Sequence, residues 1–264
     1  MCGIFGFALT KPVSMGTVFR ILSKLEIHQY PNEQRPVGGY GAGIAILDEE
    51  GNVVFEKVGK ISDSPARQLA EMVRISEASV LVGHVRMPSP HFMETARFKE
   101  TAQPYAARCC PDLTVVSVHN GYVTNYREIR AKLGEAHVLE SEKVELIDSE
   151  VIPHYFEDLL KEENDASKAL DALYLGLEGS MALSLLHVES EMAFLHIAHK
   201  GKTRGLHVWA NKQNEIVFCS RTEALNGELD DVFARGKFTE RVAVPRNEEF
   251  SVKLSFPLVS KVKA

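Results

Sequence analysis

The sequence predicts a layered α+β protein, because strand-like segments fall into two runs with helical segments between and around them. The first run ends near residue 119, and the second begins near residue 181. The chain has 264 residues, of which 45% are hydrophobic, which is enough to bury a full core. No repeat, low-complexity tract or linker divides it, so we predict a single domain over residues 1–264.

The first predicted elements are a strand and an amphipathic helix. Cys2–Ala8 is apolar and glycine-flanked, which predicts a short buried strand. Ser14–His28 predicts a helix, since its apolar residues follow the spacing 0, 3, 4 and 7 behind a serine cap. The next predicted elements are a turn region (Gln29–Tyr40), paired strands (Gly41–Leu47 and Val53–Val58), a helix (Pro65–Ile75) and two strands (Ser79–Met87 and Leu113–His119).

A long connection separates the last two of these strands. Pro88–Asp112 contains four prolines and no clear periodicity. A connection of this length inside a compact domain is typical of a functional lid, so we expect one here.

The remaining elements are helices followed by a mainly β C-terminal third. Asn125 and Glu128 match a capping box, which predicts a helix that Gly134 ends. Another helix is predicted to begin near Asp148–Glu150, and a third to include residues 170–177. The predicted C-terminal strands are Met181–Val188, Met192–Ala198, Leu206–Ala210 and Glu215–Cys219.

Composition and charge exclude several classes of function. A formal net charge of −6 and a pI near 6.0 give no reason to expect nucleic acid or an anionic membrane as partner. The chain shows no signal-peptide pattern and no apolar run of about 18 residues, so we expect a cytoplasmic protein. Cys109, Cys110 and Cys219 make neither a disulfide framework nor, without CxxC or HExxH spacing, a metal site. We therefore expect no metal and no cofactor.

Cys2 is the most informative residue, because it directly follows the initiator methionine. A methionine before so small a residue is normally trimmed, and Cys2 would then be the N-terminal residue. The thiolate is the attacking form, and an α-amine is partly neutral at cellular pH, so the amine can accept the thiol proton. This position therefore predicts a residue that supplies both a nucleophile and a base.

Four motifs stand at compatible spacings along the chain. They are Met1-Cys2-Gly3-Ile4, Gly83-His84-Val85-Arg86, His119-Asn120-Gly121-Tyr122 and Asp148-Ser149-Glu150-Val151. In this order they resemble the class II glutamine amidotransferases, whose glutaminase domains occur in glucosamine-phosphate synthase, glutamate synthase, phosphoribosyl-pyrophosphate amidotransferase and asparagine synthetase. The resemblance covers about residues 1–220, with C-terminal strands expected over 221–264. It implies a four-layer αββα sandwich of the N-terminal-nucleophile hydrolase type.

The resemblance also implies how the chain would act on glutamine. Cys2 would attack the side-chain amide carbon to form a thioester, while its own α-amine relays protons. The side-chain amide of Asn120 and the backbone N–H of Gly121 would form the oxyanion hole, where glycine allows the substrate to approach closely.

Three further residues would bind the substrate as a zwitterion. Arg86 would hold the α-carboxylate through two parallel hydrogen bonds, and the hydroxyl of Ser89 would supplement it. Asp148, kept ionised at a helix start, would pair with the α-ammonium. We expect His84 and His119 to be structural, and the connection after Arg86 to be the glutamine lid.

Some positions depart from the family pattern. Many relatives have Arg-Gly-x-Asp-Ser-x-Gly near the nucleophile, but residues 37–43 here read Val-Gly-Gly-Tyr-Gly-Ala-Gly, which removes the supporting Arg and Asp. Gln103 stands where relatives often have the histidine of Ala-His-Pro. Met87 replaces the aromatic residue usual in the sugar-phosphate enzymes, which is more similar to glutamate-synthase-type and free-standing glutaminases.

We therefore predict a free-standing glutaminase that acts on L-glutamine and delivers ammonia to a separately encoded synthase, since few residues follow the region of resemblance. One alternative is a non-catalytic glutamine-sensing subunit, which retention of Met1 would favour. A second is an N-terminal-nucleophile amidase for another amide, although such an enzyme has no need of the Arg86–Asp148 clamp. A third is a generic α/β structural protein. These motifs define neither the ammonia acceptor nor the oligomeric state.

Overall fold

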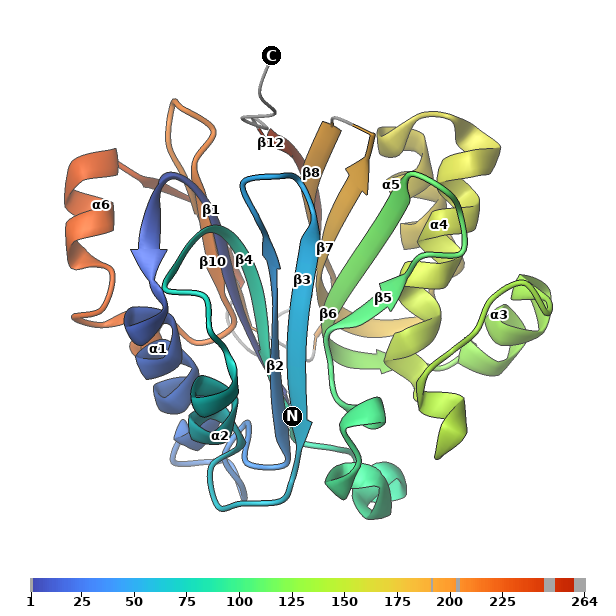
Figure 1. Ribbon diagram of the computed structural model, residues 1–264, viewed down its shortest axis with the longest axis horizontal. Coiled ribbons are helices and arrows are strands. Elements are labelled where there is room, and N and C mark those ends of the chain that lie inside the picture. Colours follow the sequence, from blue (N-terminus) through green and yellow to red (C-terminus); the bar gives the residue numbers. More distant parts are fainter. Residues whose placement is uncertain (1, 191, 203–204, 245–249, 259–264) are drawn as a thin grey trace.

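The computed structural model describes residues 2–190, 192–202, 205–244 and 250–258. Figure 1 shows two stacked β-sheets with helices on both outer faces. On one side lie α1 (Met15–Ile27), α2 (Pro65–Met72) and α6 (Asp230–Gly236), and on the other α3 (Tyr126–Leu133), α4 (Val151–Glu163) and α5 (Ala166–Gly176). The predicted four-layer αββα sandwich is confirmed.

Both sheets are antiparallel in the pairs that form them. The larger has the order β11 (Thr239–Val244), β9 (Leu206–Ala210), β10 (Ile216–Cys219), β1 (Gly3–Ser14), β4 (Glu77–Val85), β2 (Gly41–Leu47) and β3 (Val53–Gly59). The smaller has the order β12 (Phe250–Leu258), β8 (Met192–Gly201), β7 (Gly179–Glu189), β6 (Leu113–Val123) and β5 (Tyr105–Ala107). Strands from the C-terminal third thus complete the sheet that β1 begins.

β1 lies in the middle of the larger sheet, between β10 and β4. Gly3 is required where α1 packs on this strand, because a Cβ there would lie 2.7 Å from Cγ of Leu25. Ser14 then caps α1 by accepting a hydrogen bond from the N–H of Thr17, as its position in the sequence predicts. This packing fixes the position of Cys2, the residue before β1.

Three apolar layers hold the sandwich together. The first lies between the larger sheet and the α1–α2 side, and the third between the smaller sheet and α3, α4 and α5. The middle layer lies between the two sheets and includes Ile4 of β1 and Val118 of β6, both fully buried. Burying one such side chain stabilises a fold by roughly 1.5–3 kcal/mol. This layer therefore holds β1, which follows Cys2, against β6, which contains Asn120 and Gly121.

The structure corrects several predicted boundaries. β6 runs on to Val123, so Asn120 and Gly121 lie within a strand and not in a turn at its end. The capping box at Asn125 is wrong, because this side chain instead donates to the carbonyl of Gly176 and accepts from the N–H of Glu178. α2 ends at Met72, three residues before the predicted end.

The long connection after Arg86 has regular structure of its own. It contains the 3-10 helices η1 (Pro90–Arg97) and η2 (Lys99–Thr101) and then β5. A third short 3-10 helix, η4 (Asp148–Glu150), leads directly into α4. Across the described residues, we find no helix with both the length and the apolar character that a membrane span needs.

Candidate active site

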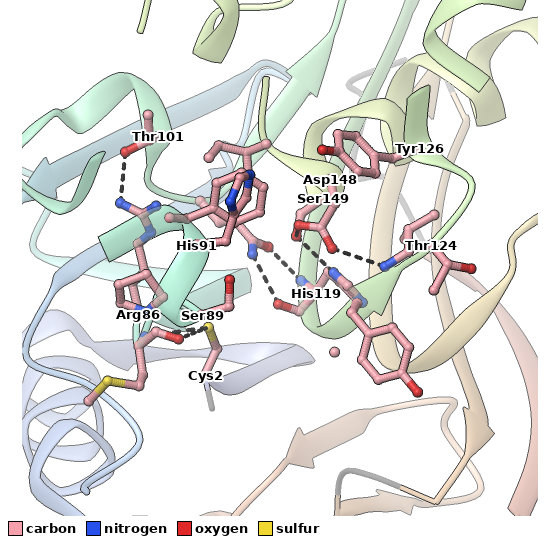
Figure 2. Close-up of a pocket in the computed structure, with 18 residues that line it drawn as sticks. Cys2, Arg86, Ser89, His91, Thr101, His119, Thr124, Tyr126, Asp148 and Ser149 are labelled. Carbon is pink, nitrogen blue, oxygen red and sulfur yellow. Dashed lines mark hydrogen bonds between the residues drawn. The ribbon is translucent and has the colours of Figure 1, made fainter. Parts of the chain in front are cut away.

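One cavity of about 230 Å³ brings together residues from distant parts of the chain (Figure 2). Its wall combines the residue before β1, the connection that follows β4, the end of β6 and the start of η4. Of the six residues that the motifs single out, five line it: Cys2, Arg86, Ser89, Gly121 and Asp148. The sixth, Asn120, contacts Cys2 directly.

The thiol of Cys2 lies against the backbone of Met87. Its Sγ accepts from the Met87 N–H at 3.4 Å and lies 3.5 Å from the carbonyl oxygen of the same residue. The nitrogen of Cys2 donates to Oδ1 of Asn120 at 3.1 Å. The predicted removal of Met1 concerns a residue outside the described part of the chain. The Cys2 nitrogen marks where an α-amine would stand, beside the Asn120 side chain.

The backbone of β6 presents alternate residues to its two edges. His119 faces away from β7, because its N–H and carbonyl bond the side chain of Gln103 at 2.6 and 3.0 Å. Val123 faces the same way, since its N–H donates to Asp148 Oδ2 at 2.9 Å. By the alternation of antiparallel strands, the N–H of Gly121 between them faces that edge too. It therefore points to the side on which the cavity lies.

Glycine is sterically necessary at position 121. A Cβ there would lie 2.1 Å from the carbonyl oxygen of Ser180 and 2.8 Å from the ring of His119. The neighbouring strand β7 thus approaches closer than any side chain would permit. Glycine keeps β6 in register and leaves the backbone N–H of this position accessible.

Arg86 is a buried cation held by neutral groups. Its guanidinium donates to the hydroxyls of Thr101 and Thr95, each at 2.7 Å, and its side chain is close to fully buried. Burial lowers the pKa of Arg86, because it removes the charge from water. Among the described residues no carboxylate lies within 4.0 Å of this guanidinium. A buried charge of this kind fits an anionic ligand.

Asp148 is a buried acid on the wall of the cavity that faces Arg86 (Figure 2). Its Oδ2 accepts from Val123 N–H, and its Oδ1 lies 3.4 Å from the hydroxyl of Ser149. Burial nevertheless raises its pKa, so desolvation outweighs these hydrogen bonds. The helix start expected at Asp148 is a three-residue 3-10 turn. Burial, and not this turn, has the largest effect on the pKa of Asp148. A cationic group in the cavity would restore the stability of the carboxylate.

Ser89 stands at the start of η1 and is exposed, with no side-chain bond to the helix that it precedes. Its hydroxyl lines the cavity near Arg86 and Cys2, as Figure 2 shows. The side chain is thus available to a ligand that enters beside the guanidinium.

Sequence reasoning missed part of the cavity wall. His119, interpreted as structural, lines the cavity, and its Nδ1 lies 2.8 Å from the Ser149 hydroxyl. Its position directly before Asn120 and Gly121 in the motif could have indicated that it lies at the cavity. His84 is fully buried, and burial places its pKa well below the usual value, which agrees with a structural role. Gln103 bridges to β6, and Thr101 orients Arg86, so the connection after Arg86 helps to build the site.

Comparisons with known proteins find relatives of this chain. A family profile described as "Glutamine amidotransferase domain" matches residues 93–227, about half of the chain. Similar curated relatives are the glutamine–fructose-6-phosphate aminotransferases [isomerizing] of Chlamydia trachomatis and Sulfolobus acidocaldarius. They are 31% and 30% identical over 76% and 94% of this chain, but the matches cover 29% and 36% of the relatives. The chain therefore spans about a third of the length of these relatives.

Solved structures show the same fold at low sequence identity. An allosteric regulatory enzyme of purine biosynthesis gives a TM-score of 0.64 at 18% identity, covering 96% of this chain and 48% of that one. Glutamine phosphoribosylpyrophosphate amidotransferase from B. subtilis gives 0.61 at 18%, covering 96% and 49%. The similarity to glutamate-synthase-type proteins inferred from Met87 stays a prediction. With a matching family profile, this shared fold and a cysteine directly before β1, the chain belongs to the glutamine amidotransferase domain family.

Proposed function

We propose that this protein hydrolyses the side-chain amide of L-glutamine at Cys2 and passes the ammonia to a separately encoded synthase. The observation that carries the proposal is that two desolvated groups of opposite charge, Arg86 and Asp148, line the cavity that the Cys2 thiol also lines. Each charge lacks a full counterion, and a zwitterionic amino acid supplies both.

The cavity size supports a small substrate. Its volume of about 230 Å³ lies below the roughly 300–1,000 Å³ of sites for drug-sized ligands, which suits a single amino acid. In our proposal the guanidinium of Arg86 and the hydroxyl of Ser89 hold the α-carboxylate. Asp148 pairs with the α-ammonium, and the side chain then extends toward Cys2.

The reaction would begin with proton transfer at Cys2. Once Met1 is removed, the free α-amine takes the thiol proton, and the thiolate forms a bond to the amide carbon. The carbonyl electrons move to oxygen, where Nδ2 of Asn120 and the N–H of Gly121 donate to the oxyanion. The hydrogen bond from the Cys2 nitrogen to Asn120 Oδ1 leaves Nδ2 for this role.

The intermediate would then collapse in two steps. The C–N bond breaks as the α-ammonium returns its proton to the leaving nitrogen, which releases ammonia and leaves a thioester. Water, deprotonated by the same amine, attacks the thioester carbon. A second oxyanion collapses, and the C–S bond breaks to release glutamate and restore the thiol.

The proposal of a partner synthase rests on relatives that contain such a domain within a longer chain. This chain spans about a third of their length, and we propose that a separate chain supplies the centre that consumes ammonia. Ammonia is mostly protonated at neutral pH and is then not nucleophilic, so a receiving synthase must take it directly. We expect that synthase to raise the glutaminase rate by stabilising the closed site.

Intact-mass measurement after treatment with a diazo-ketone analogue of glutamine tests the proposal. We expect loss of Met1 from the purified protein, one covalent addition at Cys2, and loss of both labelling and glutamate release in Cys2→Ala. Labelling at Cys109, Cys110 or Cys219 instead would overturn the assignment. Retained Met1 with glutamine binding but no labelling would instead favour the glutamine-sensing alternative.

A further inference from the structure

A second group of reactive side chains lies outside the cavity. Cys109 follows β5, His137 lies in the segment after α3, and His154 and Glu157 lie three residues apart on α4, so they share one helix face. One ligand atom from each of these four residues lies within 4.8 Å of the others. None of the four lines the cavity of Cys2.

Three of the six distances between these atoms are close to the edges of a tetrahedron around one metal ion. Nδ1 of His137 lies 3.2 Å from Nδ1 of His154, and Sγ of Cys109 lies 3.6 Å from the same His154 atom. With zinc–nitrogen bonds of ~2.0–2.1 Å and a zinc–sulfur bond of ~2.3 Å, tetrahedral edges are about 3.3–3.4 Å and about 3.6 Å. Oε2 of Glu157, at 3.6 Å from Nδ1 of His137, completes the set.

The group is also buried and oriented like a metal site. His137, His154 and Glu157 are at most 4% exposed. Oε1 of Glu157 accepts from the N–H groups of Cys109 and Cys110 at 2.8 and 3.0 Å, which turns Oε2 inward. Within the described part of the chain, Oε2 has no hydrogen-bond donor.

A carboxylate behind one imidazole completes the arrangement. Nε2 of His137 lies 3.0 Å from Oδ1 of Asp158, and a proton held there leaves the lone pair of Nδ1 directed at the centre of the group. Metal-bound histidines commonly donate their other N–H to a carboxylate in this way. The two Nδ1 atoms face each other at 3.2 Å, a distance that one shared proton can bridge and that also lets both lone pairs bind one cation.

We propose that Cys109, His137, His154 and Glu157 bind a structural zinc ion. One thiolate, two imidazoles and one carboxylate form a donor set that suits zinc, whereas magnesium and calcium prefer oxygen ligands alone. All four positions of the tetrahedron are protein side chains, which is typical of a structural site and not of a catalytic one.

The ion would join three segments that build the active site. α4 packs against β5 and α3, and it begins immediately after η4, which starts with Asp148. β5 pairs with β6, which carries Asn120 and Gly121. A zinc ion would therefore fix α4 relative to β5 and hold Asp148 against the cavity. The four residues act at a distance, so they are positioning residues. The four ligands come from three separate segments, so they show neither CxxC nor HExxH spacing. For this reason the sequence predicts no metal.

Metal content and cobalt substitution test the site on the full chain, independently of glutaminase activity. We expect one equivalent of zinc per chain after expression with zinc and removal of unbound metal. Replacement by cobalt should give the visible bands of tetrahedral Co²⁺ and a thiolate-to-cobalt charge-transfer band in the near ultraviolet. Cys109→Ser should lose the charge-transfer band, whereas the matched control Cys110→Ser should keep it.

Thermal unfolding of the wild type provides a second readout if the Cys109 variant fails to fold. A strong chelator should lower the Tm of the wild type, and added zinc should restore it. Two results would overturn the proposal. One is a purified wild type that contains no bound metal and gives no cobalt spectrum. That result would show that the four residues form only a hydrogen-bonded cluster. The other is a charge-transfer band that survives in Cys109→Ser, which would place the metal elsewhere.

Discussion

The nitrogen of Cys2 donates a 3.1 Å hydrogen bond to Oδ1 of Asn120, a residue 118 positions along the chain on the opposite sheet. This bond joins the proposed base to the proposed oxyanion donor, because the two ends of one amide group serve the two roles. Oδ1 orients the nitrogen, and Nδ2 is left to face the substrate. The packing of β1 against β6 through the middle apolar layer makes this contact possible.

Replacement of Asn120 should slow catalysis and leave binding nearly intact. Asn120→Ala removes the oxyanion donor, and such a loss typically lowers kcat by ~10²–10³-fold. Asn120→Asp keeps an oxygen for the Cys2 nitrogen but loses Nδ2, so it should be slow as well. Steady-state glutamate release measures both. If Asn120→Asp recovers wild-type kcat, the residue serves to hold Cys2 and not to bind the oxyanion.

The clamp predicts a different kinetic signature at Arg86. Arg86→Lys keeps a charge but loses the planar fork, so KM for glutamine should rise by roughly 10–100-fold with a smaller change in kcat. Thr101→Val removes the hydroxyl that orients the guanidinium at 2.7 Å and should raise KM by a smaller factor. Arg20→Lys, an exchange at an exposed ion pair with Glu228, is the matched control. An unchanged KM in Arg86→Lys would move the carboxylate site elsewhere.

Asp148 should make substrate binding depend on pH. Its pKa is raised by burial, and the protonated acid cannot pair with an ammonium group. KM should therefore increase as the pH falls through this raised pKa, at a higher pH than an ordinary aspartate would require. Asp148→Asn should have a high KM that no longer varies in that range. Asp231→Asn, at an exposed position of α6, serves as the control for charge alone.

The sequence predicted the parts of the fold that depend on local pattern. The apolar spacing behind Ser14 gave α1 to within a residue of its observed bounds, and Gly41–Leu47 is β2 as predicted. The helix predicted between Asn125 and Gly134 is α3, but the Asn125 side chain does not cap it, because it bonds residues 176 and 178, which only the tertiary fold brings near. The extension of β6 to Val123 likewise depends on pairing with β7.

For the site, motif resemblance named residues that meet at one cavity, but it did not give their supports. Thr95 and Thr101 hold Arg86 from the connection after it, where no periodic signal exists. Gln103, which stands where relatives often have a histidine, bonds both backbone groups of His119, on the edge of β6 that pairs with β5. These contacts arise from the three-dimensional path of an irregular segment, so spacing alone could not reveal them.

The last prediction concerns stability at low pH and a pair of buried histidines. His187 and His196 stack on the smaller sheet, with Nε2 of His196 at 3.4 Å from Nδ1 of His187. Burial lowers the pKa of His187 to about 4 and that of His196 to about 3. Phe156 of α4 packs on both rings, and the carboxylate of Glu189 lies 3.6 Å from Nε2 of His187.

Both folded-state pKa values lie below the ordinary ~6.5, so the unfolded chain binds more protons than the folded chain between these values. The contribution of the two neutral histidines to the free energy of unfolding is fully present above about pH 6.5. It is lost as the pH falls toward about 4, by up to ~1.4 kcal/mol per pH unit for each histidine. Buried acids such as Glu26, whose pKa is raised by burial, act in the opposite direction. The comparison must therefore be made between variants.

Urea unfolding at several pH values measures this effect. His196→Gln should reduce the slope of unfolding free energy against pH between about pH 6.5 and 4, because one proton-binding difference is removed. Parallel curves for His196→Gln and wild type, displaced but equal in slope, would show that His196 is already charged in the folded protein. His196 would then bind its proton over the same pH range in the folded and the unfolded chain, and its burial would not oppose protonation.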